Sequence, residues 1–278
     1  MTSESVPQVA LRHGAQMPQL GLGTWPLSNR EAERVVVSAV EAGYRLFDTA
    51  YAYGNEEGVG RGMRASGLPR EELFVTTKLN GQWHGVEAAQ DAWAGSAQRL
   101  GVDYIDLFLI HWPLPRQDRY VDAVRGLAKL LEDGRVRAVG TSNFKPAHLD
   151  RVITEAGIVP DVNQIQLSPY TTRDEARAYH AEQGIVTQSW SPLGLGGELL
   201  REPAIREVAK HHSKSTAQVI LRWHIELGLS AVPKSANPKR MAENIDIFDF
   251  ALSDAEIAAL SALDRGEASA DDSDVMGH

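Results

Sequence analysis

Four polar residues of the sequence could act together as an acid: Asp48, Tyr53, Lys78 and His111. A free phenol has a pKa of about 10 and is a poor acid at neutral pH, but a nearby ammonium favours the phenolate and lowers that pKa. Lys78 can supply this charge to Tyr53, and Asp48 can hold Lys78 as its ion-pair partner. His111 can hydrogen-bond the same oxygen that the tyrosine protonates. The set predicts an acid that protonates a carbonyl oxygen while the carbonyl carbon accepts hydride.

The hydride has to come from a cofactor, because no amino-acid side chain supplies it. The sequence contains neither G-x-G-x-x-G nor G-x-x-x-x-G-K-[ST]. Lys234, Ser235 and Arg240 form a basic, hydroxyl-bearing cluster after the last predicted strand, which is a common phosphate-binding place in barrels. Lysine and arginine there favour the extra phosphate of NADP. The sequence contains no cluster of histidine or cysteine residues that would bind a metal ion, so we expect no metal site.

Eight short β-rich runs alternate with longer helical patterns along the chain. Their continuous apolar character is typical of strands that are buried on both faces. The predicted strands are Leu20–Thr24, Arg45–Thr49, Leu73–Leu79, Tyr104–Trp112, Val136–Ser142, Val162–Leu167, Ile185–Trp190 and Leu229–Pro233. Eight strand–helix units in 278 residues predict a closed (β/α)8 TIM barrel. A doubly wound open sheet is the alternative.

Glycines mark the ends of the predicted helices, because glycine adopts the left-handed conformation of a helix C-terminus without a Cβ clash. They precede seven of the strands, at Gly43, Gly67, Gly101, Gly134, Gly157, Gly184 and Gly228. Residues 6–19 predict a β-hairpin before the first barrel strand. Two helical patterns, Pro203–His212 and Thr216–Leu227, separate the last two strands, so one of them is an extra helix. We expect one domain over residues 1–278, with an irregular tail from about residue 265.

The chemistry of a barrel lies where its strands end. Each predicted strand end carries a polar or aromatic residue: Asp48, Lys78, His111, Ser142 with Asn143, Gln164, Trp190 and Lys234 with Ser235. Taken singly, Asp48 and Lys78 could be a structural ion pair and His111 a core histidine. Their occurrence at successive strand ends favours the catalytic interpretation.

Composition limits the possible functions. The chain is 43% hydrophobic and 23% charged, which is typical of a folded globular protein, and it contains no cysteine. No apolar run approaches the roughly 20 residues of a membrane helix. A net charge of -9 argues against nucleic-acid binding. These features predict a cytoplasmic, monomeric enzyme that acts on a small molecule.

The sequence resembles the aldo-keto reductase family from about Val9 to Leu263. Within the family it is most similar to the bacterial reductases that include 2,5-diketo-gluconate reductase. The matching segments, in family order, are Gly21–Thr24, Asp48–Glu56, Leu73–Lys78, Asp106–Trp112, Gly140–Phe144, Asn163–Gln166, Ser189–Leu193 and Val232–Ser235 with Arg240 and Asn244. It departs from the family pattern at Gln166 and Ser168, where relatives usually have Glu and His.

The resemblance implies a role for each matching residue. Tyr53 would be the general acid of a tetrad with Asp48, Lys78 and His111. Ser142, Asn143 and Gln164 would hold the nicotinamide carboxamide, and Trp190 would stack on the ring. Further implied contacts to NADPH are Thr24, Ser191, Leu193, Val232, Lys234, Ser235, Ala236, Arg240, Glu243 and Asn244. An apolar substrate pocket beside His111 would be walled by Trp25, Trp83 and Trp112.

The predicted function is therefore NADPH-dependent reduction of aldehydes or ketones, with keto-sugars and α-dicarbonyls as candidate substrates. Two other classes stay open. One is a nucleotide-binding barrel with a regulatory role and slow turnover. The other is a phosphate-binding barrel isomerase or lyase that uses Asp48 and Lys78 without hydride transfer.

Overall fold

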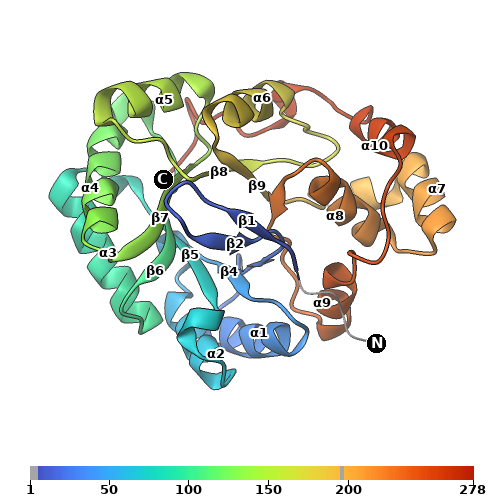
Figure 1. Ribbon diagram of the computed structural model, residues 1–278, viewed down its shortest axis with the longest axis horizontal. Coiled ribbons are helices and arrows are strands. Elements are labelled where there is room, and N and C mark those ends of the chain that lie inside the picture. Colours follow the sequence, from blue (N-terminus) through green and yellow to red (C-terminus); the bar gives the residue numbers. More distant parts are fainter. Residues whose placement is uncertain (1–5, 195–196) are drawn as a thin grey trace.

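The centre of the computed structural model, which describes residues 6–194 and 197–278, is a parallel sheet (Figure 1). Its strand order is β10-β9-β8-β7-β6-β5-β4-β3. Each of the eight predicted strands is present. Their bounds are β3 Leu22–Gly23, β4 Leu46–Asp48, β5 Phe74–Leu79, β6 Ile105–Ile110, β7 Val136–Ser142, β8 Val162–Gln166, β9 Val186–Trp190 and β10 Ser230–Ala231.

The sheet closes on itself between its first and last strands. Leu20 forms a parallel bridge with Ala231, and the Gly23 N–H donates to the Pro233 carbonyl at 3.1 Å. Glycine is needed at position 23 because a Cβ there would lie 2.8 Å from the Val232 carbonyl oxygen. The fold is therefore the predicted (β/α)8 barrel, and the open-sheet alternative is wrong.

The strands are buried on both faces, as their apolar sequences predict. Alternate residues of a strand point in opposite directions, so Leu107 and Leu109 of β6 pack inside the barrel with Leu46 and Val162. Phe108, between them in sequence, packs outward against the helices. Apolar side chains thus fill this part of the barrel interior.

Helices surround the barrel (Figure 1). Their bounds are α1 Asn29–Glu41, α2 Glu56–Ala65, α3 Val86–Leu100, α4 Tyr120–Glu132, α5 Pro146–Arg151, α6 Asp174–Gln183, α7 Pro203–His212, α8 Thr216–Glu226, α9 Pro238–Ile245 and α10 Asp254–Ser261. The extra helix between the last two strands is confirmed, since both α7 and α8 lie there. All seven predicted glycine stops have φ between 66° and 106°. Within the described residues, no helix has the length and apolarity needed to cross a membrane.

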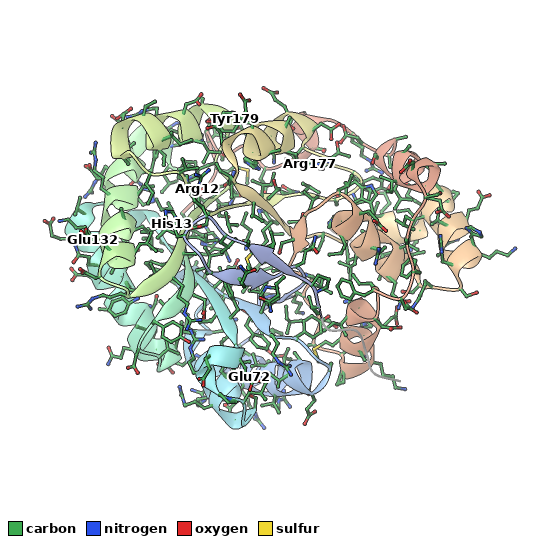
Figure 2. All side chains as sticks on the ribbon, viewed as in Figure 1. Arg12, His13, Glu72, Glu132, Arg177 and Tyr179 are labelled. Carbon is green, nitrogen blue, oxygen red and sulfur yellow. The ribbon has the colours of Figure 1, made fainter. Side chains whose placement is uncertain are left out.

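The predicted hairpin is also present, with β1 Gln8–Ala10 antiparallel to β2 Gln16–Pro18. Arg12 and His13 lie at its turn (Figure 2), and Arg12 Nη2 donates to the carbonyl of Gln183, the last residue of α6, at 2.7 Å. The His13 N–H donates to Asp161 Oδ1 at 2.9 Å, immediately before β8 begins. The hairpin therefore covers the amino-terminal end of the strands and leaves the carboxyl end free.

Candidate active site

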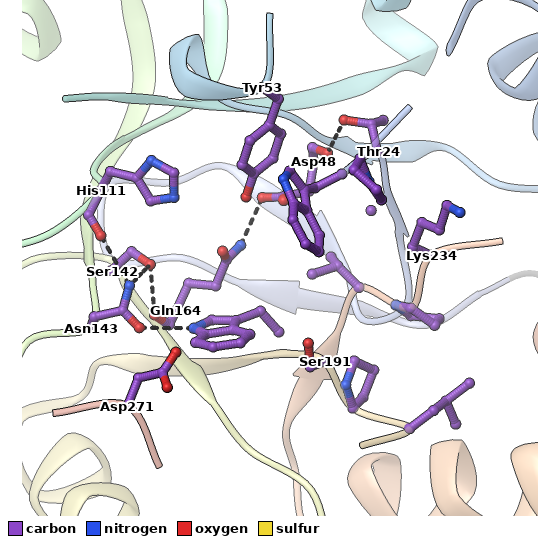
Figure 3. Close-up of a pocket in the computed structure, with 18 of the residues that line it drawn as sticks. Thr24, Asp48, Tyr53, His111, Ser142, Asn143, Gln164, Ser191, Lys234 and Asp271 are labelled. Atoms are coloured by element: carbon purple, nitrogen blue, oxygen red, sulfur yellow. Dashed lines mark hydrogen bonds between the residues drawn. The ribbon is translucent and has the colours of Figure 1, made fainter. Parts of the chain in front are cut away.

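The four predicted catalytic residues come together at the carboxyl end of neighbouring strands. Asp48 is the last residue of β4, Lys78 lies near the end of β5, and His111 follows β6 directly. Tyr53 ends a 3-10 turn, Tyr51–Tyr53, in the loop after β4. Figure 3 shows the side chains of Tyr53, His111 and Asp48 directed into one space.

Lys78 is fully buried and paired. Its Nζ lies 2.8 and 2.7 Å from the two carboxylate oxygens of Asp48, 3.0 Å from the Thr49 carbonyl and 3.4 Å from the Tyr53 hydroxyl. Burial is the largest single effect and by itself lowers the pKa of Lys78, but Asp48 and Tyr53 together outweigh burial and raise that pKa above its ordinary value. Lys78 is therefore an ammonium ion that faces the phenol.

The pKa of Tyr53 corrects one expectation from the sequence. Lys78 does act to lower it, as predicted, but burial is the larger effect and raises the pKa of Tyr53 above its ordinary value. Removal of the phenolate from water is costly, and the ammonium offsets only part of that cost. Tyr53 therefore keeps its proton at neutral pH, which is the form that a proton donor needs.

His111 lies edge-on to Tyr53, with ring centroids 5.6 Å apart. Burial, with help from the Lys78 charge, lowers the pKa of His111 well below its ordinary value. The imidazole is therefore neutral and can donate one N–H. Its buried Nδ1 has no hydrogen-bond partner among the described residues.

The loop that carries Tyr53 is held by buried Asn55. Asn55 Nδ2 donates to the carbonyls of Thr24 and Leu27 at 3.1 and 2.9 Å. Its Oδ1 accepts from Thr49 Oγ1 at 2.6 Å. Thr24 Oγ1 in turn donates to the Asp48 carbonyl at 2.9 Å. This network ties the loop to β3 and β4, so the position of the phenol is set by the barrel.

A cavity of about 530 Å³ opens in front of the tetrad, within the range of small-molecule sites. Most of the predicted cofactor residues line it. The predicted residues in its wall are Thr24, Trp25, Asp48, Tyr53, His111, Ser142, Asn143, Gln164, Trp190, Ser191, Leu193, Val232 and Lys234. Lys78 is not in this wall, but its partners Asp48 and Tyr53 both are.

One side of the cavity is a connected set of amides beside an indole. Asn143 Nδ2 donates to the His111 carbonyl at 3.0 Å, and Asn143 Oδ1 accepts from Trp190 Nε1 at 2.8 Å. Gln164 Nε2 donates to Asp48 Oδ1 at 2.7 Å, while its Oε1 accepts from no described residue. Ser142 Oγ donates to the Gln164 carbonyl at 2.9 Å. The network connects these amides to the tetrad. The side-chain oxygens of Gln164 and Asn143 can still accept hydrogen bonds from a flat aromatic amide.

The opposite end of the cavity is basic. Lys234 lines it, and α9 begins just beyond, with Asn237 accepting from the Lys239 and Arg240 N–H groups at 2.9 and 3.2 Å. Arg240 is exposed on the first turn of α9 and forms no ion pair within the described part of the chain. The predicted cofactor residues that lie beyond the cavity wall are Ser235, Ala236, Arg240, Glu243 and Asn244. Two cations close to a helix N-terminus can attract an anion.

The tryptophans behave differently from one another. Trp25 lines the cavity and is 61% exposed. Trp83 and Trp112 are not in the cavity wall: Trp83 packs edge-on against Tyr51 and Trp112 lies beside His278, with centroids 6.3 and 6.4 Å apart. The proposed contact of Trp83 and Trp112 with substrate therefore stays a prediction.

The sequence did not reveal that the tail forms part of the site. Asp271 and His278 both line the cavity, and the His278 ring lies edge-on to His111 at 4.7 Å. The Asp271 N–H donates to Gln166 Oε1 at 2.8 Å, so the glutamine that departs from the family pattern fastens the tail. Ser168, the second departure, forms a turn with Thr171. The small, acidic composition of the tail contains no local signal for this placement.

Ion pairs hold the tail from the outside. Lys145 Nζ lies 2.6 Å from Asp272 Oδ1 and 2.5 Å from Asp274 Oδ2, and His148 Nε2 lies 3.0 Å from Asp274 Oδ1. Lys145 follows β7 and His148 lies on α5. Such exposed pairs are individually weak and are screened by salt. The tail is therefore held by several weak contacts rather than by a packed core.

We expect Lys145→Gln to loosen the tail. Trypsin should then cleave after Arg265 several-fold faster than in the wild-type chain, because local opening exposes the bond. Mass spectrometry of a time course checks this. Lys129→Gln, a change on α4 away from the tail, is the control. Equal cleavage rates for the wild-type chain and Lys145→Gln would show that these ion pairs do not hold the tail.

Comparison with known proteins shows the family to which the chain belongs. A profile of the Aldo/keto reductase family matches residues 18–265. An aldo-keto reductase of Mycolicibacterium smegmatis is 48% identical over 261 residues, 94% of each chain. Methylglyoxal reductase DkgA of Yersinia pestis is 45% identical over 273 residues, 98% of each.

Solved structures of related proteins have a fold similar to that of this chain. An aldo/keto reductase from Brucella melitensis superimposes with a TM-score of 0.91 at 48% identity, covering 94% of this chain and 98% of that one. A variant of Gox0644 in complex with NADPH gives 0.94 at 40% identity, covering 99% and 100%.

Barrel, site and relatives together define an oxidoreductase built on a (β/α)8 barrel. The chain belongs to the aldo/keto reductase family. The resemblance that its sequence segments predicted is thereby confirmed, including its similarity to the diketo-gluconate reductase branch.

Proposed function

We propose that this chain reduces aldehydes and ketones with NADPH, and that Tyr53 supplies the proton. The observation that supports this most is the buried phenol 3.4 Å from an ammonium ion, at the wall of a cavity that also contains a neutral imidazole. A relative crystallised with NADPH and another with NADP support the choice of cofactor.

Residues in the cavity wall and beyond its basic end match the successive parts of NADPH. Gln164 Oε1 and Asn143 Oδ1 can accept from a carboxamide, and the Trp190 indole offers a flat face for the ring. Lys234 and Arg240 can neutralise phosphate at the other end. When bound, NADPH supplies hydride from C4 of its nicotinamide to the carbonyl carbon.

The side chains of the tetrad then act on the carbonyl oxygen. Tyr53 and His111 can both hydrogen-bond that oxygen and polarise the carbonyl group. Tyr53 gives its proton to the oxygen as the hydride arrives, so an alcohol and a phenolate form. The Lys78 ammonium stabilises the phenolate until water returns the proton. Because burial keeps Tyr53 protonated, the free site is set for reduction rather than oxidation at neutral pH.

We propose small aldehydes and α-dicarbonyls as substrates ahead of keto-sugars. His278 reduces the space beside His111, and a relative over 98% of the chain is a methylglyoxal reductase. Loss of NADPH absorbance with methylglyoxal, a simple aromatic aldehyde and a keto-sugar tests the proposal. Turnover with none of these carbonyls, despite NADPH binding, would instead favour a regulatory barrel.

Arg240→Ala should weaken the binding of NADPH about tenfold and leave the affinity for NADH nearly unchanged, because only NADPH carries the extra phosphate that a guanidinium binds strongly. Quenching of tryptophan fluorescence on titration gives both dissociation constants. Arg206→Ala, an exposed arginine on α7, should change neither. Equal weakening of NADPH and NADH by Arg240→Ala would argue against a phosphate contact.

We further expect the enzyme to act as a cytoplasmic monomer.

A further inference from the structure

A second group of chemically reactive side chains lies away from the cavity, where two helices meet. His211 and His212 are the last two residues of α7, and Glu256 lies in the first turn of α10. His211 Nδ1 lies 2.8 Å and His212 Nε2 2.9 Å from the same oxygen, Glu256 Oε1. The three potential ligand atoms lie within 4.8 Å of one another.

Two of these three side chains are held in place by their surroundings. Glu256 Oε2 accepts from the Ser253 N–H and hydroxyl, both at 2.8 Å, in the capping box of α10. Its other oxygen, Oε1, is thereby directed at the histidines. The His212 ring packs on Phe250, with centroids 5.2 Å apart. Such outer contacts orient metal ligands in known sites.

We propose that His211, His212 and Glu256 bind a divalent transition metal, with Zn²⁺ as the best match. Two imidazole nitrogens and one carboxylate oxygen are a ligand set that zinc uses widely, with a further position left to water. Zinc–ligand bonds of about 2.0 Å place tetrahedral ligand atoms about 3.3 Å apart. The observed separations to Oε1 of 2.8 and 2.9 Å need only a small expansion.

The three side chains can move apart by this amount, because the site is open to solvent on the His211 side. The His211 side chain is 73% exposed, whereas those of His212 and Glu256 are 16% and 14% exposed. A glutamate side chain is ionised at neutral pH, so Glu256 offers a carboxylate oxygen to the ion.

Binding of the metal would join α7 to α10. The unfolded chain does not hold the three ligands together, so Zn²⁺ would favour the folded state. None of the three residues lines the cavity, so the ion would act as a structural clamp outside the reaction. The sequence analysis expected no metal site, since Glu256 is distant in sequence from the two histidines and no local pattern joins them.

Calorimetric titration of chelator-treated protein with ZnCl2 tests the proposal. We expect one ion per chain and a rise in Tm of about 5 °C at a hundredfold excess over Kd. His211→Gln should fold normally, because the side chain is mostly exposed, yet bind Zn²⁺ at least tenfold more weakly. His212→Gln should do the same, while His13→Gln, on the distant hairpin, should bind as the wild-type chain does.

Two results would overturn the site. One is no stoichiometric binding by the wild-type chain. The other is the same affinity and the same rise in Tm in His211→Gln and His212→Gln, which would mean that Zn²⁺ binds elsewhere. Since both measurements use the chain without substrate, they are independent of the proposed reductase activity.

Discussion

Replacement of Tyr53 by phenylalanine should lower turnover by about 10²–10⁴-fold, the usual contribution of a positioned acid. The change removes one hydroxyl whose only hydrogen bond among the described residues, to Lys78, is 3.4 Å long, so the fold should be retained. NADPH affinity should stay near the wild-type value, because the phenol acts on the carbonyl. Steady-state kinetics and fluorescence titration measure the two effects separately.

The neighbouring tyrosine provides a matched control. Tyr51 lies on the same 3-10 turn, but its ring packs against Trp83 and under Arg99, whose Cζ is 5.0 Å from the ring centroid. Tyr51→Phe should keep turnover within about threefold of wild type. If Tyr53→Phe retained turnover, or if Tyr51→Phe lost as much, Tyr53 would not be the proton donor.

Replacement of Lys78 by methionine should affect both activity and stability. Without the ammonium, nothing opposes the effect of burial on Tyr53, so the pKa of the phenol rises further and the phenolate product is no longer stabilised. We expect a loss in kcat/KM comparable to that of Tyr53→Phe. Because Asp48 is left as a buried, unpaired charge, we also expect a loss of about 3–5 kcal/mol in the free energy of unfolding.

A second substitution separates these two effects. The double variant Lys78→Met with Asp48→Asn has no unpaired buried charge, so denaturant unfolding should recover most of the lost stability. Its turnover should stay as low as that of Lys78→Met, since the charge beside the phenol is still missing. If turnover returned together with stability, Lys78 and Asp48 would be a structural pair only.

The barrel could be predicted because its signals are local. A continuous apolar run or a glycine stop needs only neighbouring residues, and all seven predicted glycine stops have positive φ in the structure. The tetrad followed from the barrel, because parallel strands bring their ends together. Val136–Ser142 was predicted to the residue.

The rest depends on contacts that sequence spacing does not encode. The tail reaches the cavity through Gln166 and Lys145, which are far from it in sequence. The direction of the pKa shift of Tyr53 depends on the balance between burial and one charge, and a sequence gives the charge but not the burial. Likewise, His211 and Glu256 are far apart in sequence and come into contact only in the folded chain.

The central claim is that the Tyr53 hydroxyl and the hydride-donating carbon face each other across the cavity. A crystal structure of the chain with NADP⁺ and a carbonyl inhibitor tests it directly. We expect the carbonyl carbon about 3–3.5 Å from C4 of the nicotinamide, and its oxygen about 2.7 Å from the Tyr53 hydroxyl. A nicotinamide ring that lay away from Trp190, with C4 turned from Tyr53, would contradict the account.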